Sequence, residues 1–193
     1  RACAYSRAGI LWSDPAQDKF EPEEVARDLH AALAAAGEKP PYVLVAHSRG
    51  GLYNLIFAGL YRDEVVGMVF ADSSHPDQEK RFREAGLPVG EYVSPAQELS
   101  LAFSWTGLMR LSPYPADPSI SDEVRAFYPK SARANAREAR ERSRTMDAAG
   151  RYRDLQNWPV VVLARELPEQ TQARQRADAH DDYLLSADGL VAG

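Results

Sequence analysis

The chain has 193 residues, enough for one domain or for one domain with an insertion. Hydrophobic residues make up 45% of it and charged residues 26%, which is ordinary for a globular protein. The net charge of −5 gives no reason to expect nucleic-acid binding, and no apolar run is long enough to span a membrane. The single cysteine cannot form an internal disulfide, and no Cys/His cluster has metal-ligand spacing, so neither a metal nor a cofactor is predicted.

Short apolar runs alternate with amphipathic stretches in the first part of the chain. The predicted elements, in order, are a short buried strand at 2–5 that includes Cys3, a loop at 6–15, a helix at 21–36, a strand at 42–46, a helix ending near Tyr61 and a strand at 65–71. Such strand–helix–strand alternation, with nearly continuous apolar strands, predicts an α/β fold with a mostly parallel sheet and helices on both faces.

The alternation stops after the third strand. Residues 73–158 contain no convincing strand and predict helices that begin near Ser94 and Ser121. Residues 131–153 predict one long helix, and because this stretch is rich in arginine we expect it to face solvent. A last group of predicted elements comprises a strand at 159–164, a helix at 169–185 and the start of a strand at 190–192.

One six-residue motif, Ala46-His47-Ser48-Arg49-Gly50-Gly51, stands between a predicted strand and a predicted helix. A small residue lies two positions before Ser48 and another two positions after it, as a nucleophile elbow requires. In such a turn the serine adopts a strained backbone conformation that lifts its hydroxyl off the sheet edge. Gly51 would allow the helix to pack closely on the sheet. The motif therefore predicts that Ser48 is a nucleophile with a positive φ angle.

Three stretches together resemble the α/β-hydrolase superfamily, in its lid-bearing branch of serine hydrolases. They are Ala4–Gly9 with Trp12–Pro15, Tyr42–Gly51 and Val69–Pro76, and Val160–Leu163 is a weaker match. The resemblance implies a partial hydrolase fold in which 1–78 and 159–193 form the core and 79–158 form a helical lid. It also implies that the strands at 42–46, 65–71 and 159–164 pair in this order, in parallel. Residues 2–5 would then either pair with 42–46 or remain as a frayed edge.

The resemblance also implies that the chain is a fragment truncated at both ends. The family's second oxyanion donor precedes the strand matched by residues 2–5, and its catalytic histidine follows a strand that would begin near Leu190. Both would lie outside the chain, so we expect the fragment to be nearly inactive.

Three residues are candidate members of the catalytic machinery. Ser48 would be the nucleophile, and the backbone N–H of Arg49 would donate to the oxyanion. Asp72, at the end of the strand after the elbow helix, would orient the catalytic base. Glu166 is the alternative acid, because it follows the strand at 159–164, where the family's acid more often lies. Capping of Ser73 and Ser74 is the structural alternative for Asp72.

None of the four histidines fits the role of the base. His47 is next to Ser48 on the strained turn and should not reach its hydroxyl, and His30 lies on the first helix. We expect His75 to order the loop after Asp72, and His180 to lie far from Ser48.

The resulting hypothesis is a serine hydrolase that acts on a small-molecule ester or related acyl bond through an acyl-enzyme. The alternative is a non-catalytic protein of the same fold that binds a ligand or partner beneath its lid. A cytoplasmic location is expected.

Overall fold

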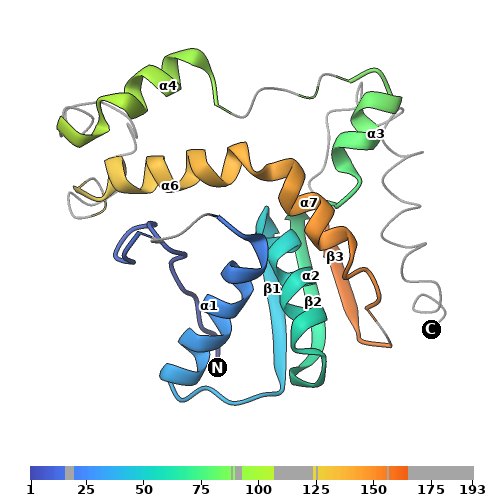
Figure 1. Ribbon diagram of the computed structural model, residues 1–193. Helices are drawn as coiled ribbons and strands as arrows, with labels where there is room; N and C mark the ends of the chain where they lie inside the picture. Colours follow the sequence, from blue (N-terminus) through green and yellow to red (C-terminus); the bar gives the residue numbers. More distant parts are fainter. Residues whose placement is uncertain are drawn as a thin grey trace.

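The computed structural model describes residues 1–15, 20–87, 89, 93–106, 124, 126–155 and 157–164. The structure has an α/β fold built on a parallel sheet (Figure 1). Within the described part of the chain the strands are β1 (Tyr42–Ser48), β2 (Val65–Ser73) and β3 (Val160–Leu163), in the spatial order β1-β2-β3. Both pairings are parallel, with Leu44 opposite Met68 and Met68 opposite Val160. The predicted strand order is therefore confirmed.

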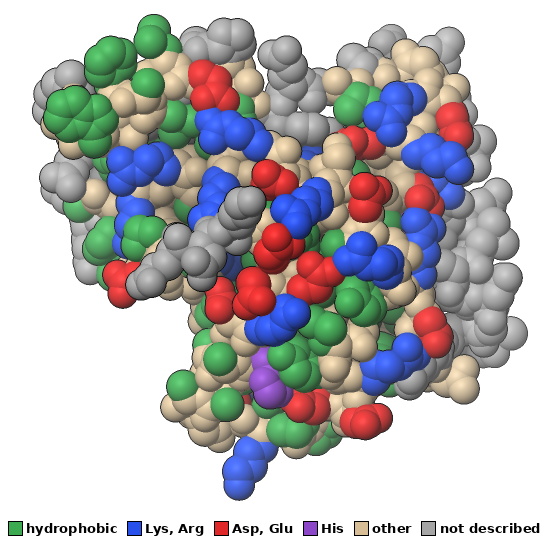
Figure 2. All heavy atoms as spheres, in the orientation of Figure 1, with side chains coloured by type: hydrophobic (Ala, Val, Ile, Leu, Met, Phe, Trp, Pro, Cys, Tyr) green, Lys and Arg blue, Asp and Glu red, His purple; other side chains and the backbone are tan. Residues whose placement is uncertain are grey.

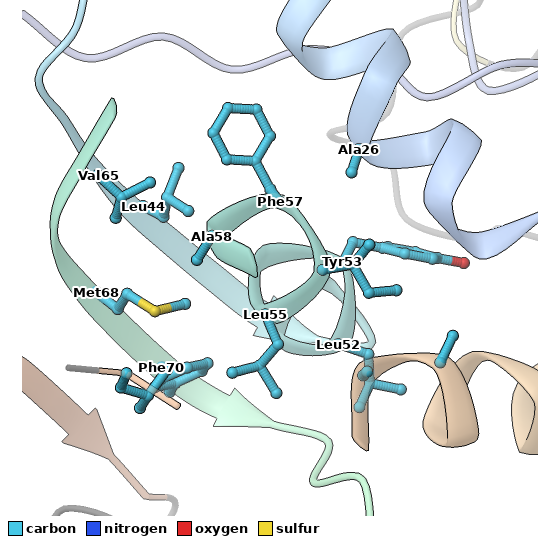
Figure 3. Close-up of a cluster of buried hydrophobic side chains, with 14 of the residues drawn as sticks. Ala26, Leu44, Leu52, Tyr53, Leu55, Phe57, Ala58, Val65, Met68 and Phe70 are labelled. Carbon is cyan, nitrogen blue, oxygen red and sulfur yellow. The ribbon is translucent and has the colours of Figure 1, made fainter. Parts of the chain in front are cut away.

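Helix α2 (Gly50–Leu60) lies on the sheet and forms the centre of the core. Its sequence is apolar on nearly every side, as expected for a helix covered all round. Figure 3 shows Leu44, Met68 and Phe70 of the strands on one side of this helix and Ala26 of α1 on another. Burial of these side chains fixes the strand ends that carry Ser48 and Asp72.

Two more helices pack around α2. Helix α1 (Pro22–Ala35) begins with a proline in its first turn and buries Ala26, while α7 (Arg142–Gly150) contributes Met146, Ala148 and Ala149 to the same core. The 3₁₀ turn η1 (Arg62–Glu64) joins α2 to β2. Ion pairs tie α1 to α7, among them Arg151 with Glu23, and Figure 2 shows such charges interleaved over this face.

The other helices lie beyond the carboxyl ends of the strands. They are α3 (Gln78–Glu84), α4 (Pro95–Ala102), the 3₁₀ turn η2 (Ser104–Thr106) and α6 (Tyr128–Arg140). Figure 1 shows α6 running above the first loop, with its C-terminal end near the upper end of β1 and with α4 above it. Helix α6 therefore lies next to the edge where the elbow was predicted. None of the described helices is long and apolar enough to cross a lipid bilayer.

Residues 2–5 do not form the predicted buried strand. They have no regular secondary structure and are exposed, and Cys3 is an exposed free thiol. A short apolar run becomes a strand only when a neighbouring strand satisfies its backbone groups, and the ladder at β1 involves β2 alone in the described part of the chain. Of the two outcomes predicted for this segment, the structure matches the frayed edge.

One other expectation needs correction. Residues 131–153 form two helices, α6 and α7, with a break at Glu141, and both have a buried side. Val43 and Val45 lie on the face of the sheet opposite α2 and are 59% and 70% exposed among the described residues, so a helix on that face stays a prediction. The elements predicted at 169–185 and 190–192 lie outside the described residues.

Candidate active site

Ser48 lies at a tight turn between a strand and a helix. Strand β1 ends at Ser48 and α2 begins at Gly50, so a single residue separates the two elements. The φ angle of Ser48 is 52°, in the left-handed region that non-glycine residues rarely adopt. Ser48 is also exposed. The positive φ angle predicted for the elbow is therefore confirmed.

Small residues make this turn possible. A Cβ atom added at Gly50 would lie 3.4 Å from the Cβ of Ala46, so these two residues face each other and leave little room for longer side chains. A Cβ atom at Gly51 would lie only 2.7 Å from the Cβ of Ser73, a distance that real Cβ atoms do not tolerate. Gly51 thus lets the start of α2 approach the end of β2, as predicted.

Asp72 occupies a second strained position at the same edge of the sheet. The register shifts here, because His47 is opposite Ala71 whereas Ser48 is opposite Ser73. Asp72 is the extra residue on β2, and its φ angle is 45°. Bulges and left-handed residues of this kind cluster at functional sites, where they re-aim a side chain. The structure therefore brings Ser48 and Asp72 to neighbouring strand ends.

Two hydrogen bonds join these strand ends. The Ser74 amide donates to the Ser48 carbonyl at 2.9 Å, and the Ser73 hydroxyl donates to the Ala46 carbonyl at 3.0 Å. The turns after β1 and β2 are consequently one connected unit.

Comparisons with known proteins agree with this geometry. The family model described as alpha/beta hydrolase fold matches residues 1–168. The chain belongs to the alpha/beta hydrolase fold family.

Similar proteins of known sequence match only part of the chain. An uncharacterized protein of Schizosaccharomyces pombe is 42% identical over 73 residues, which are 38% of this chain and 14% of that protein. The uncharacterized protein YqjL of Bacillus subtilis is 34% identical over 73 residues, 38% of this chain and 29% of that protein. The chain therefore spans less than a third of the length of either relative.

Solved structures of the family share the fold. A mutant of the haloalkane dehalogenase DatA from Agrobacterium tumefaciens C58 is 14% identical, with a TM-score of 0.54, over 89% of this chain and 66% of that one. A mutant of DbjA is 17% identical, with a TM-score of 0.52, over 81% and 61% of the two chains. At this level of identity the likeness concerns the fold alone.

A catalytic base would contact the Ser48 hydroxyl, and the structure places the described histidines elsewhere. The ring of His30 stacks on Tyr61 and lies 3.0 Å from a carboxylate oxygen of Glu64, at the end of α2 that is remote from Ser48. His47 is exposed and alternates with Ala46, so it lies on the face of the sheet opposite α2. His180 and Glu166 lie outside the described residues.

His75 orders the loop after β2, in agreement with its predicted role. Its Nδ1 accepts a hydrogen bond of 3.0 Å from the Asp77 amide, and Asp77 in turn accepts two bonds from Arg153. Burial lowers the pKa of His75 to about 4, and the Asp77 carboxylate opposes this effect only in part. His75 is therefore neutral at pH 7.

A buried carboxylate next to the elbow was not predicted. Glu138 of α6 is 4% exposed and accepts two bonds of 2.9 Å from Arg7 and one of 2.6 Å from Arg49. Arg7 comes from the first loop, and Arg49 is the residue after Ser48. The spacing of Ala132, Ala136 and Ala139 indicated a buried side of this helix, but the arginine-rich composition concealed it.

Helix α6 is also fixed to the first loop. The Ser131 hydroxyl accepts from the Leu11 amide at 2.9 Å, and Lys130 Nζ donates to the Ser13 carbonyl at 3.0 Å. Gly9, with a φ angle of 78°, allows a close approach, because a Cβ atom there would lie 2.9 Å from the Cβ of Ala134. The position of α6 over the sheet edge is thus set by several independent contacts.

A cavity of about 180 Å³ lies between the first loop, α1 and α6. Its walls include Tyr5, Phe20 and Val25 together with Arg7 and Glu138. Neither Ser48 nor Asp72 is among the described residues that line it, so we assign no substrate to this cavity. In the described part of the chain no group of three or more His, Cys, Asp or Glu side chains is arranged to hold a metal ion.

Proposed function

We propose that the protein is a serine hydrolase that acts on a small-molecule ester or related acyl bond. The observation that carries this proposal is the positive φ angle of Ser48 at the turn between β1 and α2, in a chain that belongs to the alpha/beta hydrolase fold family. A strained strand-to-helix turn of this kind presents a nucleophilic serine above the sheet.

The proposed chemistry is acyl transfer in two steps. Ser48 Oγ attacks the substrate carbonyl carbon while a base takes the hydroxyl proton, and the carbonyl π electrons move to oxygen. Collapse of this tetrahedral intermediate expels the alcohol, which leaves with the proton, and forms an acyl-enzyme. Water then attacks the acyl-enzyme in the same manner and releases the acid and free Ser48. The Arg49 N–H, at the start of α2, would stabilise the oxyanion in both steps.

Asp72 is our proposal for the acid that orients the base. It is supported by its place at the strand end next to Ser48 and by its left-handed backbone conformation. Glu166, which lies outside the described residues, is the alternative. No described histidine is assigned as the base.

A serine nucleophile argues against haloalkane dehalogenase chemistry, since that reaction in this superfamily uses a carboxylate at the elbow. We therefore do not propose for this chain the dehalogenase activity named for its structural neighbours. The non-catalytic alternative, a protein that binds a ligand beneath the 79–158 segment, is favoured only by the other contacts of His30 and His75.

Ester turnover distinguishes these two functions. The protein expressed from its complete gene is expected to hydrolyse p-nitrophenyl esters, and Ser48→Ala should abolish this turnover without loss of folding. A variant that retains the wild-type rate would exclude Ser48 as the nucleophile. A folded wild-type protein that hydrolyses no ester would support the non-catalytic alternative.

A further inference from the structure

Glu138 is a buried anion with two cationic partners. Its side chain is 6% exposed, whereas those of Arg7 and Arg49 are 29% and 26% exposed. Burial lowers the pKa of Arg7, but the bonded Glu138 carboxylate outweighs this effect, so that the pKa lies above its ordinary value. Arg7 is therefore charged at pH 7, and both arginines form salt bridges with Glu138. Removing the carboxylate would leave two like charges close together with no anion between them.

The two arginines use Glu138 differently. Arg7 donates through Nε and Nη2 to both carboxylate oxygens, which is the bidentate geometry that holds a carboxylate most firmly. Arg49 donates through Nη1 to one of these oxygens. The Arg7 pair therefore fixes the carboxylate, and the fixed carboxylate holds the guanidinium of Arg49.

Arg49 belongs to the peptide that matters most for the proposed chemistry. Its own amide follows Ser48, and its carbonyl accepts from Leu52 in the first turn of α2. A side chain anchored at its far end restricts the rotation of this backbone segment. Since α6 is itself fixed to the first loop through Ser131 and Lys130, Glu138 is a rigid anchor for the elbow.

We infer that Glu138 is a positioning residue of the active site, which acts through Arg49 to hold the Ser48–Arg49 peptide in its reactive conformation. This inference rests on the proposed function, because it concerns the orientation of the proposed oxyanion donor. A purely structural role would stabilise the fold without any particular effect on the elbow.

Glu79 provides a matched control for a purely structural role. It is a buried carboxylate, 6% exposed, that accepts from the Ser143 hydroxyl at 2.8 Å and lies 3.7 Å from Arg142 Nε. It joins α3 to α7, and neither of these contacts involves the elbow. Glu79→Gln and Glu138→Gln therefore make the same chemical change at two buried sites, only one of which touches Arg49.

The experiment compares Glu138→Gln, Glu79→Gln, Arg49→Gln and the double variant of Glu138 and Arg49 in the protein expressed from its complete gene. The first measurement is kcat and KM for a p-nitrophenyl ester. We expect Glu138→Gln to lower kcat about tenfold, equivalent to about 1.4 kcal/mol, with little change in KM. The double variant should be no slower than Arg49→Gln alone, because Glu138 acts through Arg49. Glu79→Gln should retain the wild-type kcat.

The second measurement is amide hydrogen exchange of a peptide covering residues 46–52, which does not depend on turnover. Exchange there should be faster in Glu138→Gln than in the wild type and unchanged in Glu79→Gln. If Glu138→Gln does not fold, Arg49→Gln replaces it, since that variant keeps the bidentate Arg7 pair and should show the same faster exchange.

The inference is overturned if the Glu138 and Arg49 effects on kcat simply add, or if Glu138→Gln and Glu79→Gln give equal changes in kcat and exchange. If the wild type hydrolyses no ester, the proposed function fails, and exchange alone decides the inference. Faster elbow exchange in Glu138→Gln would then support the positioning role, and unchanged exchange would refute it.

Discussion

The backbone amide of Ser74 donates to the carbonyl of Ser48 at 2.9 Å and so joins the turn after β2 to the turn after β1. Both turns contain a left-handed residue that is not glycine, Ser48 in one and Asp72 in the other. Such backbone strain costs free energy and persists only where the surrounding contacts over-determine it. Here the contacts are this hydrogen bond, the Ser73–Ala46 bond and the close packing of Gly51 on Ser73.

Gly51 is predicted to be the least replaceable glycine of the elbow. Gly51→Ala places a Cβ atom 2.7 Å from the Cβ of Ser73 and should lower the free energy of unfolding by about 1–3 kcal/mol. Gly50→Ala is the matched control, because its Cβ atom would lie at a tolerable 3.4 Å from Ala46, and it should change stability by less than about 1 kcal/mol. Urea unfolding of both variants tests this. Equal stability of the two variants would contradict the packing described for Gly51.

Local features of the site were predictable from sequence, and long-range ones were not. The conformation of Ser48 follows from its small neighbours, and the role of Gly51 from the strand and helix on either side, so a few adjacent residues were sufficient. The burial of Glu138 depends on Arg7, which is 131 residues away, and composition alone favoured an exposed helix. The exposure of Cys3 could not be predicted for the same reason. Whether residues 2–5 form a strand depends on a neighbouring strand and not on their own apolar pattern.

Arg7 is predicted to be important for stability. Arg7→Gln leaves the buried Glu138 carboxylate with Arg49 as its only partner among the described contacts and should lower the free energy of unfolding by about 3 kcal/mol. Arg27→Gln removes an exposed pair with Glu24 and should cost less than about 1 kcal/mol. Thermal or urea unfolding of the two variants measures the difference. A loss at Arg7 as small as the loss at Arg27 would show that the Glu138 cluster does not stabilise the fold.

Stability is predicted to fall between about pH 6.5 and pH 4 because of His75. Its pKa is about 4 in the folded protein and about 6.5 when the chain is unfolded, so the unfolded state binds more protons in this range and acid favours unfolding. The charged groups that face the ring are Asp77, Arg81 and Arg153. Because water screens the partly buried ring, we expect a loss of about 1–2 kcal/mol.

His75→Gln tests this pH dependence, since glutamine does not titrate. The variant should lose less stability than the wild type when urea unfolding is repeated from pH 7 to pH 4. Below pH 4, protonation of Asp77, whose pKa is lowered mainly by its hydrogen bonds with Arg153, should destabilise both proteins alike. An unchanged pH profile in His75→Gln would assign the loss to other groups.

Asp72 is predicted to contribute to catalysis more than Glu166. Asp72→Asn is the informative change, because asparagine tolerates a φ angle of 45° and keeps the size of the side chain. Loss of the orienting carboxylate should lower kcat by about 10²–10⁴-fold, whereas Glu166→Gln should have little effect. Steady-state kinetics on one ester compares the two. The opposite ranking would make Glu166 the acid and leave Asp72 with a role in the bulge alone.

The proposed role of Ser48 is tested most directly by covalent labelling. The protein expressed from its complete gene is treated with a fluorophosphonate, which phosphonylates activated serines with loss of fluoride, and the adduct is located by peptide mass spectrometry. We expect one adduct, on Ser48, that an excess of ester substrate suppresses and that Ser48→Ala abolishes. Ser13→Ala, a change in the first loop, should label like the wild type. A folded wild-type protein with no adduct on Ser48, or with its adduct on another residue, would show that Ser48 is not the nucleophile of a hydrolase.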